Sequence, residues 1–291
     1  FVDYSEQLKQ KQARLSKVFE RVNGDPANCS MLGASQILSY RNRVQFKSDG
    51  VTLGYLAQGS HEIADVGHCL ILNEANQLHL RALRQSLPNS DWHPNKKRQW
   101  TTIDIDDERG TPLVNQRQAF RQGNSEQNEQ LRAWLRSRLV NLSRPNTVFE
   151  LFCGSGNLTE VIVERVDVPV IAIEGDEMSL DALSALNLSN VQAARVNLFS
   201  QHSIRDNMPE SQPGIGVVLD PPRDGLKERE AMKSWFTKAE WVVYVSCDLG
   251  TWERDTIFLQ SCGLDLDEAT GLDMFPQTPH IETLSVFTRR A

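Results

Sequence analysis

The chain has 291 residues, of which 40% are hydrophobic and 24% charged, and its formal net charge is −7. These values are ordinary for a globular protein of about two domains, and the acidity weighs against a large independent nucleic-acid interface. No apolar run approaches the roughly 18 residues that span a bilayer, and no apolar signal segment follows the polar start. We therefore expect a cytoplasmic protein without a membrane partner.

The chain contains five cysteines, Cys29, Cys69, Cys153, Cys247 and Cys262. Their odd number and scattered positions argue against a disulfide framework and favour a reducing compartment. No C-x-x-C pair occurs, so we expect no self-contained metal site.

The first half of the chain predicts an α+β domain. Residues 3–22 form a helical pattern with one apolar face, and Asn23–Pro26 ends it. Short extended runs between residues 36 and 71, with a hairpin turn at Ser48–Gly50, predict a small antiparallel sheet. A helix near 73–86 and a strand over 101–105 follow. We place this domain at residues 1–115 and regard it as a candidate RNA-binding domain.

The second half, residues 116–291, predicts a Rossmann-like α/β domain. After an entry helix over 125–141, strands and helices alternate, which indicates a parallel sheet covered on both faces. The expected strands are 147–152, 169–174, 190–196, 215–220 and 240–246, with helices over 157–165, 176–187 and 227–238. Two more strands, near 265–272 and 282–288, complete the sheet.

A glycine turn, Gly154-Ser155-Gly156, follows the first strand of this domain and leads into a helix near Asn157. Glycines allow a sharp turn and close approach of a ligand to the backbone. Glu174 ends the second strand, 20 residues after Gly154 (174 − 154), where doubly wound folds place a carboxylate that binds ribose hydroxyls. The turn therefore predicts a nucleotide-like cofactor.

Two cofactors fit this turn, a dinucleotide and S-adenosylmethionine. Thr159 stands where the dinucleotide motif has its third glycine or alanine. The flanking acids Glu150 and Glu160 suit a sulfonium cation better than a pyrophosphate. S-adenosylmethionine is therefore favoured, and Asp220, directly after the fourth strand, is expected at the same ligand-binding edge.

Cys247 and Glu282 form the candidate catalytic pair. Cys247 follows the buried run Val243–Ser246, and Glu282 begins the last strand. A cysteine and a carboxylate suit methylation of uracil at C5. This carbon is a poor nucleophile until a thiolate adds at C6, after which C5 can take the methyl group. The carboxylate then removes the C5 proton, and elimination frees the cysteine. Cys153 and Cys262, by contrast, are expected to be buried small hydrophobes.

Residues 150–157, 220–225, 244–255 and 273–282 resemble motifs of the RNA uracil-5 methyltransferase family, and Phe120–Asn124 with Asn128 resembles the segment that leads into its catalytic domain. The resemblance implies a class I S-adenosylmethionine methyltransferase fold, RNA (tRNA or 23S rRNA) as the substrate, and no obligate protein partner. It assigns cofactor contacts to Gln122, Phe152, Asn157, Glu174, Asn197 and Asp220, and catalysis to Cys247 and Glu282. Gly154, in the glycine turn, is a further expected cofactor contact, and Arg223 and His280 are expected to bind the substrate.

The chain departs from the family pattern at three points. Asp248-Leu249 replaces the usual Asn-Pro after the cysteine, and an acid there is expected to raise the thiol pKa or to alter uracil contacts. The amino-terminal β-barrel of many relatives is not represented in this sequence. His68–Ile71 resembles the segment that supplies the last ligand of an iron–sulfur cluster, so Cys69 would be a ligand in a longer form, but we expect no cluster in this chain.

A target base must leave its stack to reach Cys247, and unpaired bases often stack on aromatic or arginine side chains. Arg223, Trp92, Trp100 and the basic run Lys96–Arg98 are therefore candidate RNA contacts. Three alternatives stay open: an RNA cytosine-5 methyltransferase, an RNA-binding protein with a degenerate methyltransferase domain, and a dinucleotide oxidoreductase. The first is disfavoured because Asp220–Arg223 lacks the Pro-Cys dipeptide of such enzymes, and the last by the glycine spacing.

Overall fold

The computed structural model describes residues 2–290, which divide into two compact units. The larger unit combines the chain up to residue 34 with the chain from residue 127 onward, and the smaller unit comprises residues 35–126. This division differs from the expected boundary near residue 115. The first helix, α1 (Tyr4–Arg21), contributes Val18 and Phe19 to the core of the larger unit and therefore belongs to it.

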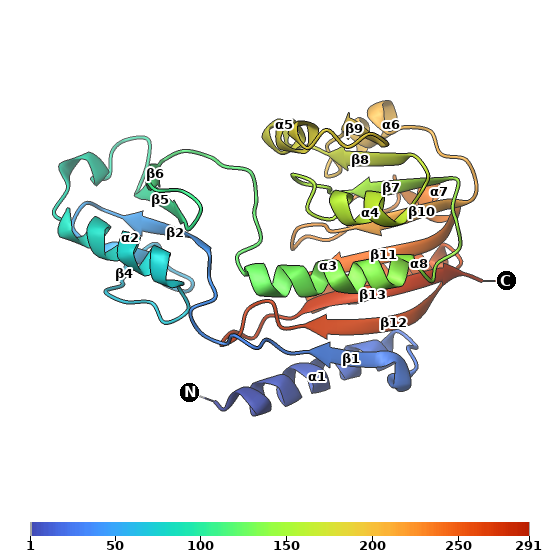
Figure 1. Ribbon diagram of the computed structural model, residues 1–291, viewed down its shortest axis with the longest axis horizontal. Helices are drawn as coiled ribbons and strands as arrows, with labels where there is room; N and C mark the ends of the chain where they lie inside the picture. Colours follow the sequence, from blue (N-terminus) through green and yellow to red (C-terminus); the bar gives the residue numbers. More distant parts are fainter. Residues whose placement is uncertain (1, 291) are drawn as a thin grey trace. The chain divides into compact units, whose positions relative to one another are not determined.

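The larger unit is built on one eight-stranded sheet, with the strand order β1-β12-β13-β11-β10-β7-β8-β9 (Figure 1). Strands β7 to β11 are mutually parallel, β13 is antiparallel to both of its neighbours, and β1 pairs in parallel with β12. The strands are β1 (Cys29–Leu32), β7 (Thr147–Leu151), β8 (Val170–Glu174), β9 (Val191–Arg195), β10 (Ile215–Leu219), β11 (Ala239–Ser246), β12 (Leu264–Leu272) and β13 (Glu282–Arg289).

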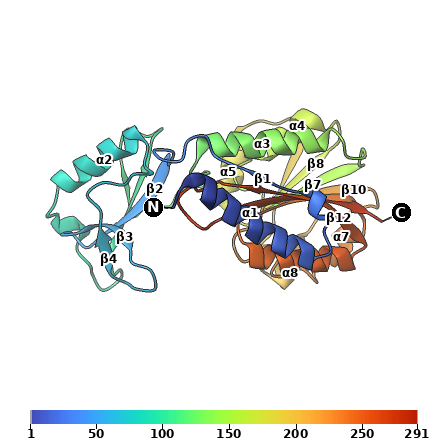
Figure 2. The ribbon, with the colours of Figure 1, turned by 90° about the horizontal axis from the view of Figure 1, so that it is seen from below.

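Helices cover both faces of this sheet (Figure 2). On one face lie α3 (Ser125–Leu139), whose residues from Gln127 belong to this unit, α4 (Thr159–Arg165) and α5 (Glu177–Ala185). On the other lie α1, α6 (Gln201–Asn207), α7 (Lys233–Phe236) and α8 (Leu249–Ser261). The parallel sheet with helices on both faces confirms the expected fold.

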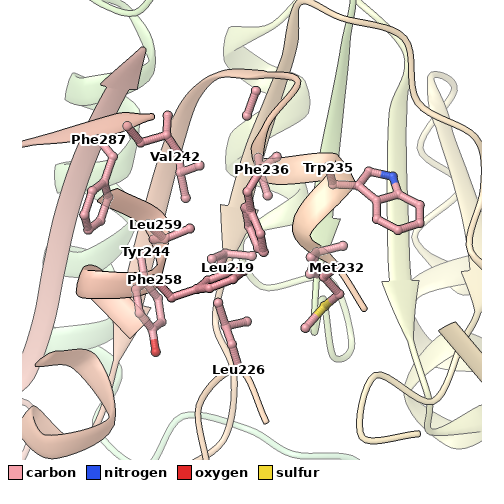
Figure 3. Close-up of a cluster of buried hydrophobic side chains, with 14 of the residues drawn as sticks. Leu219, Leu226, Met232, Trp235, Phe236, Val242, Tyr244, Phe258, Leu259 and Phe287 are labelled. Atoms are coloured by element: carbon pink, nitrogen blue, oxygen red, sulfur yellow. The ribbon is translucent and has the colours of Figure 1, made fainter. Parts of the chain in front are cut away.

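The central strands are apolar on both faces because both faces are covered. In β11, Val242 and Tyr244 point into the core under α7 and α8, whereas Val243 and Val245 point into the core under α3 and α4. Figure 3 shows the first of these cores, where side chains from β10, β11, β13, α7 and α8 meet. Each such buried side chain stabilises the fold by about 1.5–3 kcal/mol, so the strand ends that carry the site rest on a rigid base.

Three elements of the larger unit were not expected from the sequence, β1, α6 and α8. The helix expected over 227–238 is shorter, because residues 227–232 form consecutive turns before α7 begins at Lys233. The other strands expected after residue 147 are confirmed within two residues of their predicted ends.

The smaller unit is an antiparallel sheet with the order β4-β3-β2-β5-β6 and one packed helix. Its elements are β2 (Arg43–Ser48), β3 (Leu53–Leu56), β4 (Ile63–Asp65), α2 (Glu74–Gln85), β5 (Thr101–Asp106) and β6 (Leu113–Val114). The expected hairpin turn at Ser48–Gly50 is confirmed, and Gly50 adopts a φ of +91° there. Among residues 2–290, every helix is too short or too polar to span a bilayer.

Candidate active site

The glycine turn lies at the carboxyl edge of the parallel strands, directly after β7. Phe152, Gly154 and Gly156 have φ values of +62°, +54° and +98°. A Cβ on Gly156 would come within 2.7 Å of the Leu183 side chain, so this position has no room for one. The non-glycine Phe152 in the left-handed region marks a backbone that its surroundings hold in place, as is common at ligand sites.

The Glu174 carboxylate, at the end of β8, holds this turn through the backbone. Oε2 accepts a hydrogen bond from the Gly154 amide (3.2 Å), and Oε1 accepts from Gly175 (2.7 Å) and Asp176 (2.9 Å). The structure therefore places Glu174 at the end of β8, as expected, and also brings its carboxylate to the Gly154 amide. A carboxylate has about four acceptor positions, so one is left for a ligand hydroxyl.

Two side chains of α3, Asn128 and Arg132, hold Asn157 in place, and the sequence did not predict these contacts. The Asn157 amide exchanges two hydrogen bonds with the Asn128 amide, at 2.9 and 2.8 Å. Arg132 donates to the Asn157 carbonyl oxygen and forms an ion pair with Glu160 at 3.0 Å. The acid expected to face the cofactor, Glu160, is therefore partly neutralised by Arg132.

The edge next to the turn is apolar on one side. The rings of Phe152 and Phe199 lie 5.5 Å apart and are tilted by 50°. Asn197, which follows β9, accepts a hydrogen bond from the Phe199 amide at 3.0 Å and so fixes the backbone of Phe199. Aromatic side chains at this edge suit a ligand that carries a ring.

Cys247 and Glu282 face each other across a strand pair. Strands β11 and β13 are antiparallel, and their outermost registered residues are Ser246 and Thr283. One step further along, β11 reaches Cys247 and β13 begins at Glu282, so antiparallel pairing places the two residues opposite each other. Cys247 is partly exposed, whereas Glu282 is only 6% exposed.

Burial and neighbouring charges shift the pKa values of this pair. Burial, followed by the charge of Asp220, raises the pKa of Glu282 to about 8, and Arg223 opposes the shift. Burial, then Glu282 and Asp220, raises the pKa of the Cys247 thiol to about 11, again opposed by Arg223. Burial raises the pKa of Asp220 to about 7. Three acidic groups and one cation are thus close enough to interact.

Asp248, the acid that replaces the family's asparagine, caps helix α8. Its Oδ1 accepts hydrogen bonds from the amides of Gly250 and Thr251, both at 2.9 Å. Aspartate and asparagine are equally good in this position, so the cap is preserved. The acids that raise the pKa of the Cys247 thiol are Glu282 and Asp220.

Arg223 and His280, the expected substrate contacts, lie together. An Arg223 guanidinium nitrogen is 3.4 Å from His280 Nε2. Burial, followed by the charges of Arg223 and Lys11, lowers the pKa of His280. The imidazole is therefore held neutral beside the guanidinium.

Glu150, on strand β7 just before the glycine turn, is a second buried acid. Burial raises its pKa to about 8, with a further contribution from Asp220. Its Oε2 is buried without a hydrogen-bond partner. Because a neutral carboxyl is the less costly form in such surroundings, the acid is expected to be protonated at neutral pH.

Several expected residues lie elsewhere. Gln122 belongs to the smaller unit, so its cofactor contact stays a prediction. Trp92 is 7% exposed in the core of that unit, which contradicts its expected stacking on RNA. Trp100 is partly exposed and stacks on His61, with the ring centroids 6.0 Å apart. Within residues 2–290 no three metal-binding side chains gather, and the Cys69 Sγ lies 3.6 Å from the Tyr55 hydroxyl.

Comparison with known proteins identifies the family to which the sequence is similar. The sequence model of the tRNA (uracil-5-)-methyltransferase family matches residues 101–290. An uncharacterized RNA methyltransferase of Nitrosomonas europaea is 39% identical over 99% of this chain and 75% of its own length. The 23S rRNA (uracil(1939)-C(5))-methyltransferase RlmD of Acinetobacter baumannii is 29% identical over 90% of this chain, which spans 60% of that relative. RlmD of Psychromonas ingrahamii is 35% identical over 58% of this chain and 38% of its own length.

The fold has a solved counterpart. The tRNA (uracil-54, C5)-methyltransferase of Pyrococcus abyssi, in complex with S-adenosyl-L-homocysteine, superposes with a TM-score of 0.71 at 17% identity. The match covers 99% of this chain and 84% of that one, which confirms the class I methyltransferase fold. The family expected from the motifs is confirmed as well: the chain belongs to the tRNA (uracil-5-)-methyltransferase family.

Proposed function

We propose that this protein is an S-adenosylmethionine-dependent methyltransferase that methylates C5 of a uridine in RNA through a covalent adduct between Cys247 and uracil C6. The observation that carries this proposal is the position of Cys247 and Glu282. They face each other at the carboxyl edge of the sheet, at the ends of paired strands, with Asp220 and Arg223 close to both.

The residues at the strand ends fit the cofactor. Bound S-adenosylmethionine supplies a methyl group on a sulfonium cation. Phe152, Gly154 and Asn157 would line one side of it, and Glu174 would accept a hydrogen bond from a ribose hydroxyl. The fit rests on the turn, where a Cβ at Gly156 would come within 2.7 Å of Leu183, and on the Glu174 carboxylate, which keeps one acceptor position for a hydroxyl. Asn197, Asp220 and, from the smaller unit, Gln122 are the remaining proposed contacts.

Cys247 carries the first chemical step. The thiol loses its proton to solvent, Sγ bonds to uracil C6, and the electron pair of the C5–C6 double bond moves toward the C4 carbonyl as an enolate. The enolate makes C5 nucleophilic enough to accept the methyl group. Arg223, the cation that lowers the pKa values of both catalytic groups, would stabilise the negative charge on the ring.

Glu282 carries the last step. After methyl transfer C5 holds both a methyl group and a hydrogen. The Glu282 carboxylate removes that hydrogen as a proton, the C5–C6 double bond forms again, and the Sγ–C6 bond breaks. A pKa of about 8 places this base close to physiological pH, where a general base works best.

The RNA is proposed to be 23S rRNA or tRNA, and the site of action the cytoplasm. The similarity to the RlmD relatives makes 23S rRNA the first substrate to test. The RNA would present an unpaired uridine, because C6 and C5 are inaccessible within a stacked helix.

Release of tritium from C5 tests this function directly. Transcripts of 23S rRNA and tRNA carrying [5-³H]uridine are incubated with the protein and S-adenosylmethionine. We expect one tritium released to water for each methyl group transferred, and none with Cys247→Ala. Cys29→Ala, on the edge strand β1, is the matched control and should keep full activity.

Other outcomes identify the alternatives. Release only from [5-³H]cytidine transcripts would indicate a cytosine enzyme. RNA and cofactor binding without any release would indicate an RNA-binding protein with a degenerate methyltransferase domain. Either result contradicts the proposed function.

A further inference from the structure

Four polar side chains of α1, Tyr4, Gln7, Lys11 and Arg14, follow one another at intervals of three, four and three residues, so they share one face of the helix. The apolar residues Leu15, Val18 and Phe19 are buried in the unit's core. All four polar side chains contact a single distant segment, residues 273–279, which leads from β12 to Glu282. We call residues 273–281 the base loop.

The strongest contact is a buried ion pair at the start of the base loop. Lys11 Nζ lies 2.5 Å from Asp273 Oδ1, and the Tyr4 hydroxyl donates to Oδ2 at 2.9 Å. Lys11 is 3% exposed and Asp273 is fully buried. Since a buried charge is costly without its partner, this pair fixes the first residue of the loop against α1.

Two further contacts hold the middle and the end of the base loop. Gln7 and Gln277 exchange hydrogen bonds: the Gln7 amide donates to Gln277 Oε1 at 2.8 Å, and the Gln277 backbone amide donates to Gln7 Oε1 at 3.2 Å. Gln277 has a φ of +67°, an unfavourable conformation that these bonds help to maintain. Arg14 donates to the Pro279 carbonyl at 2.7 Å, one residue before His280.

The base loop matters because Glu282 is the first residue of β13. Its strand pairing begins there, with Leu272 opposite it on β12. The first residue of a strand frays when the preceding loop is free, and a displacement of about 1 Å at a reacting group can cost on the order of 100-fold in rate.

We propose that α1 is a positioning element for the proton-abstraction step, and that Gln7, Lys11 and Arg14 are positioning residues that hold Glu282 and His280 toward Cys247. The inference rests on the proposed function and deepens it. It assigns the amino-terminal helix to the final step of the reaction rather than to cofactor binding.

This role predicts a specific kinetic signature. Glu282 acts only after Cys247 has bonded to C6 and C5 has been methylated. Loosening the base loop should slow the elimination and leave the earlier steps intact, so a covalent methylated protein–RNA adduct should accumulate on ordinary uridine. A helix that merely stabilised the fold would lower adduct formation and turnover together.

The test uses Gln7→Ala and Arg14→Ala, which leave the buried Lys11–Asp273 pair in place. Gln10→Ala and Lys17→Ala are the matched controls, because both residues are exposed on the same helix and Gln10 pairs with Glu6. Each protein is mixed with S-adenosylmethionine and a uridine-containing 23S rRNA fragment. Turnover and adduct on a denaturing gel are measured, with Glu282→Gln as the benchmark for maximal accumulation.

We expect turnover to fall on the order of 10-fold in Gln7→Ala and Arg14→Ala, with adduct rising by a similar factor, and both controls to match the wild type. Unchanged turnover, or slower turnover without adduct while Glu282→Gln accumulates it, would overturn the inference. If the wild type and Glu282→Gln form no adduct even on 5-fluorouridine RNA, the proposed function itself fails, and the inference fails with it.

Discussion

Replacing Glu282 by glutamine should stabilise the protein at alkaline pH. The pKa of this buried carboxyl is raised from 4.5 to about 8. Above pH 4.5 the unfolded chain releases this proton, while the folded protein keeps it until about pH 8. Stability conferred by the neutral carboxyl is therefore lost as pH rises through this window. At 1.36 kcal/mol for each pKa unit, the full loss is about 5 kcal/mol.

Glutamine has nearly the same shape as the protonated carboxyl but does not titrate. The difference in free energy of unfolding between Glu282→Gln and the wild type should therefore shift in favour of the variant by several kcal/mol, at most about 5, between pH 5 and pH 9. Glu150, whose pKa is also raised to about 8, titrates in both proteins and cancels in the comparison.

The measurement is urea-induced unfolding followed by circular dichroism at pH 5 and pH 9. Glu240→Gln, an exposed carboxylate in the same strand as Tyr244, is the matched control and should shift by less than about 0.5 kcal/mol. A Glu282→Gln difference that is the same at both pH values, or that moves against the variant at pH 9, would refute the view that this carboxyl is buried and neutral.

Three further predictions follow from the site. Cys247→Ala should lower methyl transfer on the order of 1000-fold or more while S-adenosylmethionine affinity, measured by calorimetry, stays within about 2-fold, because the thiol takes part only in chemistry. The wild-type kcat/KM should rise from pH 6 to pH 9, since the Cys247 thiol, with a pKa of about 11, must lose its proton before it adds to C6; a kcat/KM that falls over this range would contradict the role assigned to Cys247. Tyr244→Phe removes a 2.9 Å hydrogen bond to the buried Asp255 and should cost about 1–3 kcal/mol in urea unfolding, whereas an unchanged midpoint would mean that this bond contributes nothing.

The strands and the glycine turn could be predicted because their signals are local. Apolar runs such as Val242–Val245 are typical of strands covered on both faces, and the spacing from Gly154 to Glu174 reflects one strand–helix–strand unit. The structure confirms these strands, and it adds a hydrogen bond between the Glu174 carboxylate and the Gly154 amide that the sequence did not predict.

Other features depend on partners far away in sequence. Helix α8 was not predicted because its buried side includes Asp255 and Thr256, which interrupt the apolar stripe. The buried Asp255 carboxylate is compensated by hydrogen bonds from the Tyr244 hydroxyl and the Leu226 amide and by an ion pair with Arg254. Likewise, the apolar face of α1 predicts that the helix is buried but not against which sheet, and the contact-based division places α1 with the larger unit, unlike the boundary expected near residue 115.

Cys247 and Glu282 could be predicted as candidates from local motifs, but their relative position could not. The residue types and motifs identified Cys247 and Glu282, but their opposition depends on the register of β11 and β13. Burial is the main cause of their raised pKa values; the charge of Asp220, which follows β10, adds to the shift, and Arg223 opposes it. Such distances and charges follow from the tertiary arrangement and leave no trace in local sequence.

Trapping the covalent intermediate tests the central claim most directly. The protein is incubated with S-adenosylmethionine and 5-fluorouridine-containing RNA, and the products are mapped by mass spectrometry. Fluorine at C5 cannot be removed as a proton, so the methylated adduct should persist on Cys247 and be absent from Cys247→Ala. An adduct on another cysteine, or none at all from a protein that binds both cofactor and RNA, would contradict the account.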